Sequence, residues 1–181
     1  DPRQAKHILD VEETSFHGLS TWLSTLLSAE AREHNGLDYK RHIADVDLQT
    51  LAGIIMLVRL FFVGLTLWFL RTMPFQATLG RYHQFREIGY LLLIVPLIAP
   101  HQQHYAFLFA LPAFTCVLSS LLYSGKPWTH WRWVFMGLVA VCFNAALWLG
   151  TFNALYNHYK LATYGALLLV VLLARVDVGK M

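Results

Sequence analysis

The chain has 181 residues, of which 56% are hydrophobic and only 14% are charged, and its mean hydropathy is +0.46. A chain this apolar does not fit an ordinary soluble domain of the same length. The pI of about 9.0 does not indicate a nucleic-acid partner either, because the basic residues after position 50 fall mostly in short segments between apolar runs, where they set membrane topology.

Acidic residues are concentrated at the start of the chain. Nine of the eleven lie in the first fifty residues, and beyond Leu51 only Glu87 and Asp177 remain. We therefore expect a polar N-terminal segment, residues 1–47, followed by a transmembrane helical domain, residues 48–181. Because the chain opens on Asp1 without an initiator Met or a signal peptide, we expect a processed product or the C-terminal part of a longer protein.

A short amphipathic helix is predicted at about residues 15–29. Phe16, Leu19 and Leu23 recur at helical spacing, and serines and threonines fill the other side. Thr14 or Ser15 can cap its start. The helix is too short to span a bilayer, so it is expected to lie in the membrane interface or to re-enter the protein. The alternative is a helix that packs on the membrane domain for stability alone.

Five apolar runs are predicted to cross the membrane, at about 48–70, 88–99, 105–123, 133–152 and 161–173. Asp47 is well placed to cap the first run. The Pro96 and Pro100 pair is expected to end the second, after a polar connection over 71–87, and Pro112 to kink the third. The fold class is therefore an all-α polytopic membrane bundle of about five transmembrane helices. Cys116 and Cys142 lie within apolar runs and are expected to be core residues rather than a disulfide.

Five spans place successive loops on alternate sides of the membrane. One side receives basic residues, namely Arg71, Arg81, Arg86, Lys126, Arg132, Arg175 and Lys180. The positive-inside rule assigns that side to the cytoplasm. The N-terminal segment, the turn His101–His104 and the pair Asn157 and His158 then share the outer face.

The candidate substrate-binding residues are polar side chains predicted to meet at that face or within a span. They are Glu13, Ser15, His17, Arg59, His101, Gln102, Gln103, His104, Tyr105 and His158. For Arg59, two interpretations stay open: a side chain that snorkels or bonds helix-end carbonyls, and one that faces a cavity holding an anion such as a phosphate. Each histidine, taken alone, can instead finish a helix end in water. No metal site is predicted, since no ligand motif accompanies His101 and His104.

Two stretches resemble bacterial integral-membrane glycosyltransferases of the GT-C superfamily, in particular the C-terminal half of glycosyltransferase family 87. One is Thr14-Ser15-Phe16-His17-Gly18-Leu19, a polar stretch that opens a short helix. The other is Pro100-His101-Gln102-Gln103-His104-Tyr105, which enters a proline-bearing apolar span. The tail Tyr164-Gly165-Ala166-Leu167-Leu168-Leu169 is also similar to the ends of family members.

The resemblance implies transfer of a sugar from a polyprenyl-phosphate-sugar donor to an acceptor on the outer face of the bacterial inner membrane. The donor is a lipid-linked sugar, and no cofactor is implied. Family members carry their catalytic acidic residue in a first outer loop that nothing in this chain matches, and neither Glu12 nor Glu13 is assigned to that role. The catalytic residue therefore stays unknown, and the chain is expected to hold part of the donor and acceptor cavity.

Two other functions compete with the glycosyltransferase. A non-catalytic integral-membrane subunit would use the amphipathic helix and the kinked spans as a docking surface for a membrane partner or an N-terminal half. A haem or metal protein would use His101, His104 and His158. The expected contacts of the chain in every case are membrane lipids, with no nucleic acid.

Overall fold

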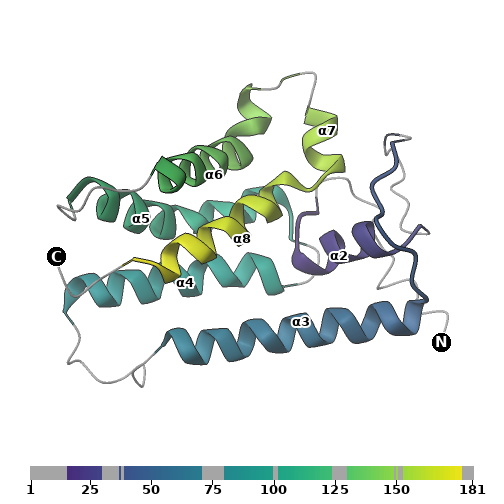
Figure 1. The fold of residues 1–181 in the computed structure, drawn as a ribbon, viewed down its shortest axis with the longest axis horizontal. Coiled ribbons are helices and arrows are strands. Elements are labelled where there is room, and N and C mark those ends of the chain that lie inside the picture. The colour runs from purple at the N-terminus through teal and green to yellow at the C-terminus, as the bar shows by residue number, and fades with distance from the viewer. Residues whose placement is uncertain are drawn as a thin grey trace.

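The computed structural model describes residues 16–29, 37, 39–70, 80–99, 102–123, 130–148, 150 and 153–176. The regular structure of these residues is helical, and successive long helices run in opposite directions, so that α3, α5 and α8 point one way and α4 and α6 the other (Figure 1). The elements in chain order are α2 (Leu19–Leu27), α3 (Leu48–Phe69), α4 (Arg81–Ile98), the 3-10 helix η1 (His104–Ala110), α5 (Leu111–Tyr123), α6 (His130–Trp148), α7 (Asn153–His158) and α8 (Leu161–Ala174). The all-helical prediction is confirmed for the described part of the chain.

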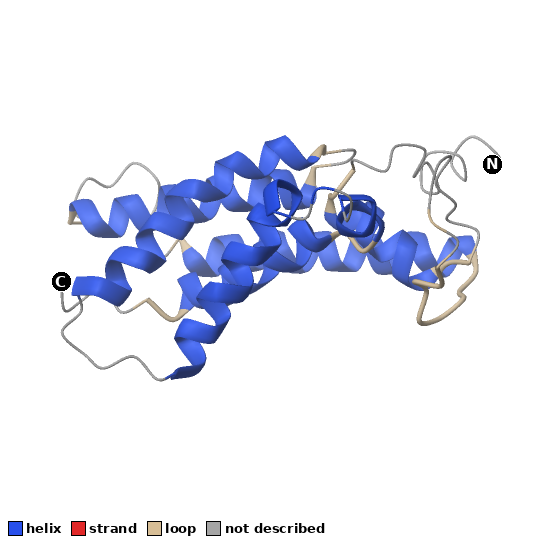
Figure 2. Ribbon diagram, turned by 90° about the horizontal axis from the view of Figure 1, so that it is seen from above, coloured by secondary structure: helices blue, strands red, loops and turns tan. Residues whose placement is uncertain are grey.

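The helices form a bundle, and α2 lies at the end of the bundle where α3 begins (Figures 1 and 2). The segment Tyr105–Tyr123 and helix α3 are each long and apolar enough to cross a membrane. The predicted N-terminal cap of α3 is confirmed: the Asp47 carboxylate accepts a hydrogen bond from the Thr50 backbone N–H at 3.0 Å. This bond satisfies one of the donors that the first turn of a helix leaves without an intrahelical partner.

The helix that contains the second predicted span begins earlier than the sequence indicates. Helix α4 starts at Arg81 rather than near residue 88, so much of the expected polar connection is helical. Its polar side chains pair inside the bundle: the Tyr82 hydroxyl donates to the Cys116 carbonyl at 2.9 Å, and the Arg86 guanidinium donates to the Val176 carbonyl at 3.0 Å. These bonds let polar residues occupy a helix that packs against its neighbours.

The Pro96 and Pro100 pair ends the second predicted span, as the sequence indicates. Helix α4 passes Pro96 and ends at Ile98, and its cap residue Ala99 is extended, which is the conformation favoured directly before a proline such as Pro100. Pro112 stands in the first turn of α5, directly after η1, so the third predicted span changes from 3-10 to α-helix beside this proline. Proline is tolerated in a first turn because its missing N–H has no partner there.

The hydrophobic core is built around α8. Helix α8 packs against α4, α5 and α6, and its buried residues include Ala166, Leu169 and Leu173. Gly165 permits the closest approach, since a Cβ there would lie 2.7 Å from the Cβ of Cys142. Both cysteines are buried free thiols, as the sequence predicted.

Candidate functional site: the His17 junction and the Arg59 pocket

Three segments that are distant in sequence meet at the His17 end of the molecule, which we call the His17 junction (residues 16–18, 102–103 and 156–163). The His17 backbone N–H donates to the Gln102 carbonyl at 2.8 Å, and Phe16 forms an isolated antiparallel bridge with Gln103. The N-terminal stretch and the His-Gln turn, both predicted for the same face, therefore contact each other through their backbones. These contacts use backbone atoms of Gln102 and Gln103 rather than their amide side chains.

The His17 ring is buried at the centre of this junction. Its exposed fraction is 0%, and its Nε2 lies 3.0 Å from Oδ1 of Asn157. The ring packs against Tyr156, with 5.3 Å between ring centroids, and burial raises the pKa of Tyr156 to about 12. The Thr163 hydroxyl also donates to the His17 carbonyl. His17 thus ties the start of α2 to α7 and α8, and no surface of its ring is open to a substrate.

His158, the residue after Asn157, also links two distant segments through its ring. Its ring is buried, and Nε2 lies 3.0 Å from the Tyr39 carbonyl. Arg41 donates back to the His158 carbonyl at 3.4 Å. These bonds hold the segment before α3 against α7, so His158 has a packing role in this structure rather than an exposed one.

The junction contains a residue that the sequence analysis missed. Lys160 has an exposed fraction of 0% and a left-handed backbone, with φ of 54°, directly before α8. Lys160 lies between two predicted spans, and a sequence alone carries no signal that a charged side chain will be enclosed. Thr163 was also missed, because the partner of its hydroxyl, the His17 carbonyl, is far away in the sequence and comes near only on folding.

Helix α2 leaves the His17 junction at a close backbone contact. A Cβ on Gly18 would lie 3.1 Å from the Ala99 carbonyl oxygen, so glycine permits α2 to begin against the end of α4. Helix α2 lies within the predicted range 15–29, and Thr21, Ser24 and Thr25 are buried together with Leu19 and Leu23. Of the predicted placements, this burial fits a helix that packs on or re-enters the protein. The polar side can be buried because its hydroxyls bond the helix's own backbone, as Ser24 does with the Ser20 carbonyl at 2.9 Å.

Arg59 extends from the middle of α3 toward α2. Its Nη2 donates to the Ser20 hydroxyl at 2.6 Å, and its side chain is half-buried. Its Nε is buried and has no hydrogen-bond partner among the described residues. Of the two predicted interpretations, the contact with Ser20 excludes a side chain that bonds only helix-end carbonyls, although it does not by itself identify a ligand.

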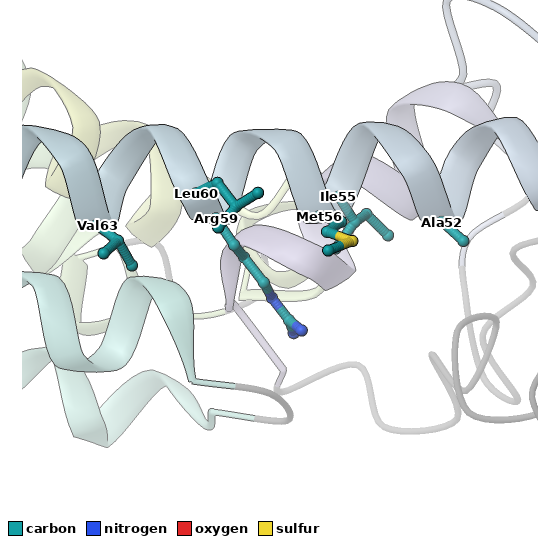
Figure 3. Close-up of a pocket in the computed structure, with 6 residues that line it drawn as sticks. All are labelled: Ala52, Ile55, Met56, Arg59, Leu60 and Val63. Carbon is teal, nitrogen blue, oxygen red and sulfur yellow. The ribbon is translucent and has the colours of Figure 1, made fainter.

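An open hollow of about 250 Å³ lies along one face of α3 beside the Arg59 side chain, and all its lining residues belong to that helix. Figure 3 shows the guanidinium projecting away from the α3 axis, beyond the apolar side chains of the same helix. We call this feature the Arg59 pocket, and its lining residues are Ala52, Ile55, Met56, Arg59, Leu60 and Val63. An apolar wall with one guanidinium suits a ligand that joins an anionic group to a hydrocarbon chain.

Of the remaining predicted site residues, the structure describes the side chain of Tyr105 and the backbone of His104. Tyr105 is exposed on η1, and His104 is the first residue of η1. Glu13, Ser15 and His101, together with Asp10, Glu12 and Thr14, lie outside the described residues. Their predicted roles stay predictions.

No group of three or more histidine, cysteine or acidic side chains able to hold a metal ion occurs within the ranges that the structure describes. No protein family, curated protein or solved structure matches this chain. The site must therefore be interpreted from its own geometry.

Proposed function

We propose that this chain spans a membrane and forms the C-terminal portion of a glycosyltransferase of the GT-C type, similar to glycosyltransferase family 87. Such an enzyme transfers a sugar from a polyprenyl-phosphate donor to an acceptor on the outer face of the bacterial inner membrane. The Arg59 pocket binds the phosphate of the lipid donor, and the His17 junction fixes the helix that holds Arg59 in place.

The observation that carries this proposal is the position of one guanidinium on an apolar helix. Helix α3 exposes large side chains such as Leu57, Phe61 and Leu67 along its length, which is typical of a surface that faces hydrocarbon. An arginine in such a helix is expensive unless it meets protein, water or an anion. Ser20 accounts for one of its donors, and a phosphate oxygen would account for the buried Nε.

The chemistry assigned to Arg59 is electrostatic. In sugar transfer from a polyprenyl phosphate, the bond between the anomeric carbon and the phosphate oxygen breaks, and negative charge develops on the departing phosphate. A guanidinium held at that oxygen stabilises the charge more in the transition state than in the ground state. The base that takes the proton of the acceptor hydroxyl is not assigned to any residue of this chain.

The test compares Arg59→Gln and Arg59→Lys in the longest protein that contains this chain, purified in detergent. The measured quantities are the Kd for polyprenyl phosphate and the rate of sugar transfer. We expect Arg59→Gln to weaken binding about tenfold or more, as charge-assisted hydrogen bonds are lost. Arg59→Lys should recover part of that loss, because it keeps the charge without the planar donor pair.

Lys40→Gln is the matched control, because it removes an exposed cation that does not line the pocket. Equal affinities for polyprenyl phosphate in the wild-type protein and in Arg59→Gln would reject the pocket as the phosphate site.

Replacing Gln103 or His104 by Ala in the same assay tests the other predicted substrate contacts. Unchanged sugar transfer in both variants would reject those contacts.

A second candidate function is a non-catalytic membrane subunit, and the exposed face of α3 is the observation that favours it. Leu60, Leu67 and Trp68 are all exposed, and a second membrane protein can cover them as well as lipid can. Purification of the protein with a partner in fixed stoichiometry would support this function. Sugar transfer by the isolated chain would exclude it.

A further inference from the structure

The end of the molecule opposite the His17 junction collects exposed cationic and aromatic side chains. Helix α4 begins there, α5 ends, α6 begins and α8 ends (Figure 1). Arg81 and Arg175 are exposed at the first and last of these positions. We call this surface, formed by residues 81–85, 123, 130–133 and 174–175, the basic end.

The charge of the basic end is one-sided. Arginines stand at positions 81, 132 and 175, and the described residues of this end include no acidic side chain. The next turn of α4 adds Glu87 and Arg86, and Arg86 points inward, where it donates to the Val176 carbonyl and lies 4.6 Å from the Phe69 ring centroid. Arg132 is half-buried, so the exposed charge is that of Arg81 and Arg175.

The opposite end has a different charge balance. Lys40 and Arg41 precede α3 there, but Asp45 and Asp47 follow within a few residues. Asp47 is ionised at neutral pH, since the Thr50 hydroxyl and backbone N–H that it accepts from lower its pKa. The described charges before α3 therefore balance, two cationic against two acidic, whereas those of the basic end are cationic, and the basic end is the one that fits an anionic partner.

Aromatic side chains stand among the arginines of the basic end. Trp131 is 71% exposed and Tyr123 is 77% exposed, with Trp133 also exposed. Indole and phenol side chains combine an apolar ring with a hydrogen-bond donor and are enriched at the level of lipid headgroups. The apolar helix α5 ends at Tyr123. These aromatic residues therefore stand where the membrane span of the proposed function meets water.

We infer that the basic end binds the headgroups of anionic phospholipids in the leaflet that it faces, with Arg81 and Arg175 as the principal phosphate contacts. Charge complementarity identifies the sign of the partner, and continuity with the apolar surface of α5 identifies it as lipid rather than an acidic protein or a nucleic acid. The inference rests on the membrane location in the proposed function, but not on sugar transfer or on the Arg59 pocket.

The test measures lipid selectivity in vesicles. The protein is reconstituted in phosphatidylcholine that contains a trace of spin-labelled phosphatidylglycerol or, separately, of spin-labelled phosphatidylcholine. The fraction of each label immobilised at the protein surface gives their relative association constant. We expect a preference of about threefold or more for phosphatidylglycerol at low salt, and a smaller preference in 1 M NaCl.

Removal of the two arginines should abolish this preference. In the double variant Arg81→Gln and Arg175→Gln we expect the two lipids to associate equally, and each single variant should lose part of the preference. Lys40→Gln is the matched control, because it removes an exposed cation from the other end and should leave the preference unchanged. A double variant that keeps the wild-type preference, or an equal loss in Lys40→Gln, would overturn the inference.

The outcomes also separate this inference from the proposed function. A wild-type protein that floats with the vesicles but shows no lipid preference overturns the inference and leaves the membrane location intact. A wild-type protein that does not associate with vesicles removes the membrane location on which both depend. Loss of polyprenyl phosphate binding in Arg59→Gln bears only on the proposed function.

Discussion

Helices α3 and α8 are both continuous apolar runs, yet the structure uses them in opposite ways. Eight of the 14 residues of α8 are buried, whereas four of the 22 residues of α3 are. The small side chains of Ala162, Gly165 and Ala166 let neighbouring helices approach α8. Helix α3 also contains Gly53 and Gly64, but nothing lies within 4 Å of a Cβ added at either glycine. An apolar run therefore predicts a helix, while tertiary packing decides whether that helix is enclosed.

Helix α2 lies between α3 and α8, and His17, just before α2, contacts Asn157, Tyr156 and Thr163 near the start of α8. His17→Ala removes the hydrogen bond to Asn157 and the ring contact with Tyr156, and it leaves a cavity in a fully buried site. We expect a loss of about 3 kcal/mol in the free energy of unfolding, measured by thermal or denaturant unfolding in detergent.

The same variant should keep its affinity for polyprenyl phosphate at a temperature where it stays folded. A His17→Ala protein with unchanged stability and abolished binding would reverse the assignment, and would make His17 a ligand contact rather than a structural one.

Gly165 and Gly64 test the packing difference between α8 and α3 directly. Gly165→Ala places a methyl group 2.7 Å from the Cβ of Cys142, whereas nothing lies within 4 Å of a Cβ added at Gly64. We expect Gly165→Ala to destabilise the protein by about 2 kcal/mol, because helices α6 and α8 must move apart. Gly64→Ala should be neutral or slightly stabilising, since alanine favours the helix. Equal unfolding temperatures for the two variants would contradict the enclosed position of α8.

Ser20 tests how α2 serves the α3 side. Ser20→Ala removes the acceptor of the Arg59 Nη2 donor and should leave the unfolding temperature nearly unchanged. We expect the affinity for polyprenyl phosphate to fall about threefold, because the guanidinium is no longer held at the pocket. Ser20→Thr keeps a hydroxyl and is the control. An affinity in Ser20→Ala equal to that of the wild-type protein would mean that Arg59 needs no support from α2.

Asp47 offers the smallest effect, at the start of α3. Its pKa is lowered by the bonds from Thr50, so its stabilisation is present above the unfolded pKa of about 3.9 and is lost as pH falls through the folded value. Asp47→Ala should therefore lower the unfolding temperature slightly at pH 7. The difference from the wild-type protein should shrink as the pH falls below the unfolded pKa and through the folded one. A difference that is constant over this range would mean that the carboxylate charge does not act as a cap.

The sequence predicted the helical class from its hydrophobic runs and the Asp47 cap from an aspartate directly before such a run. It placed the His17 and Gln102 segments on one face, and their backbone contact is a finding of the structure. It misjudged the start of α4, since Tyr82 and Arg86 find partners on α5 and after α8 that only folding brings near. It grouped His17 with Arg59 as substrate contacts. Burial separates them, and burial depends on tertiary packing that a residue pattern does not contain.

The central claim is that the Arg59 pocket on α3 holds a lipid phosphate. The most direct measurement is photocrosslinking with a polyprenyl phosphate that carries a photoreactive group next to the phosphate, followed by mapping of the labelled peptide. We predict labelling of the α3 peptide around Met56 and Leu60, competition by unlabelled polyprenyl phosphate, and loss of labelling in Arg59→Gln. Labelling confined to other helices, or α3 labelling that survives Arg59→Gln unchanged, would contradict the claim.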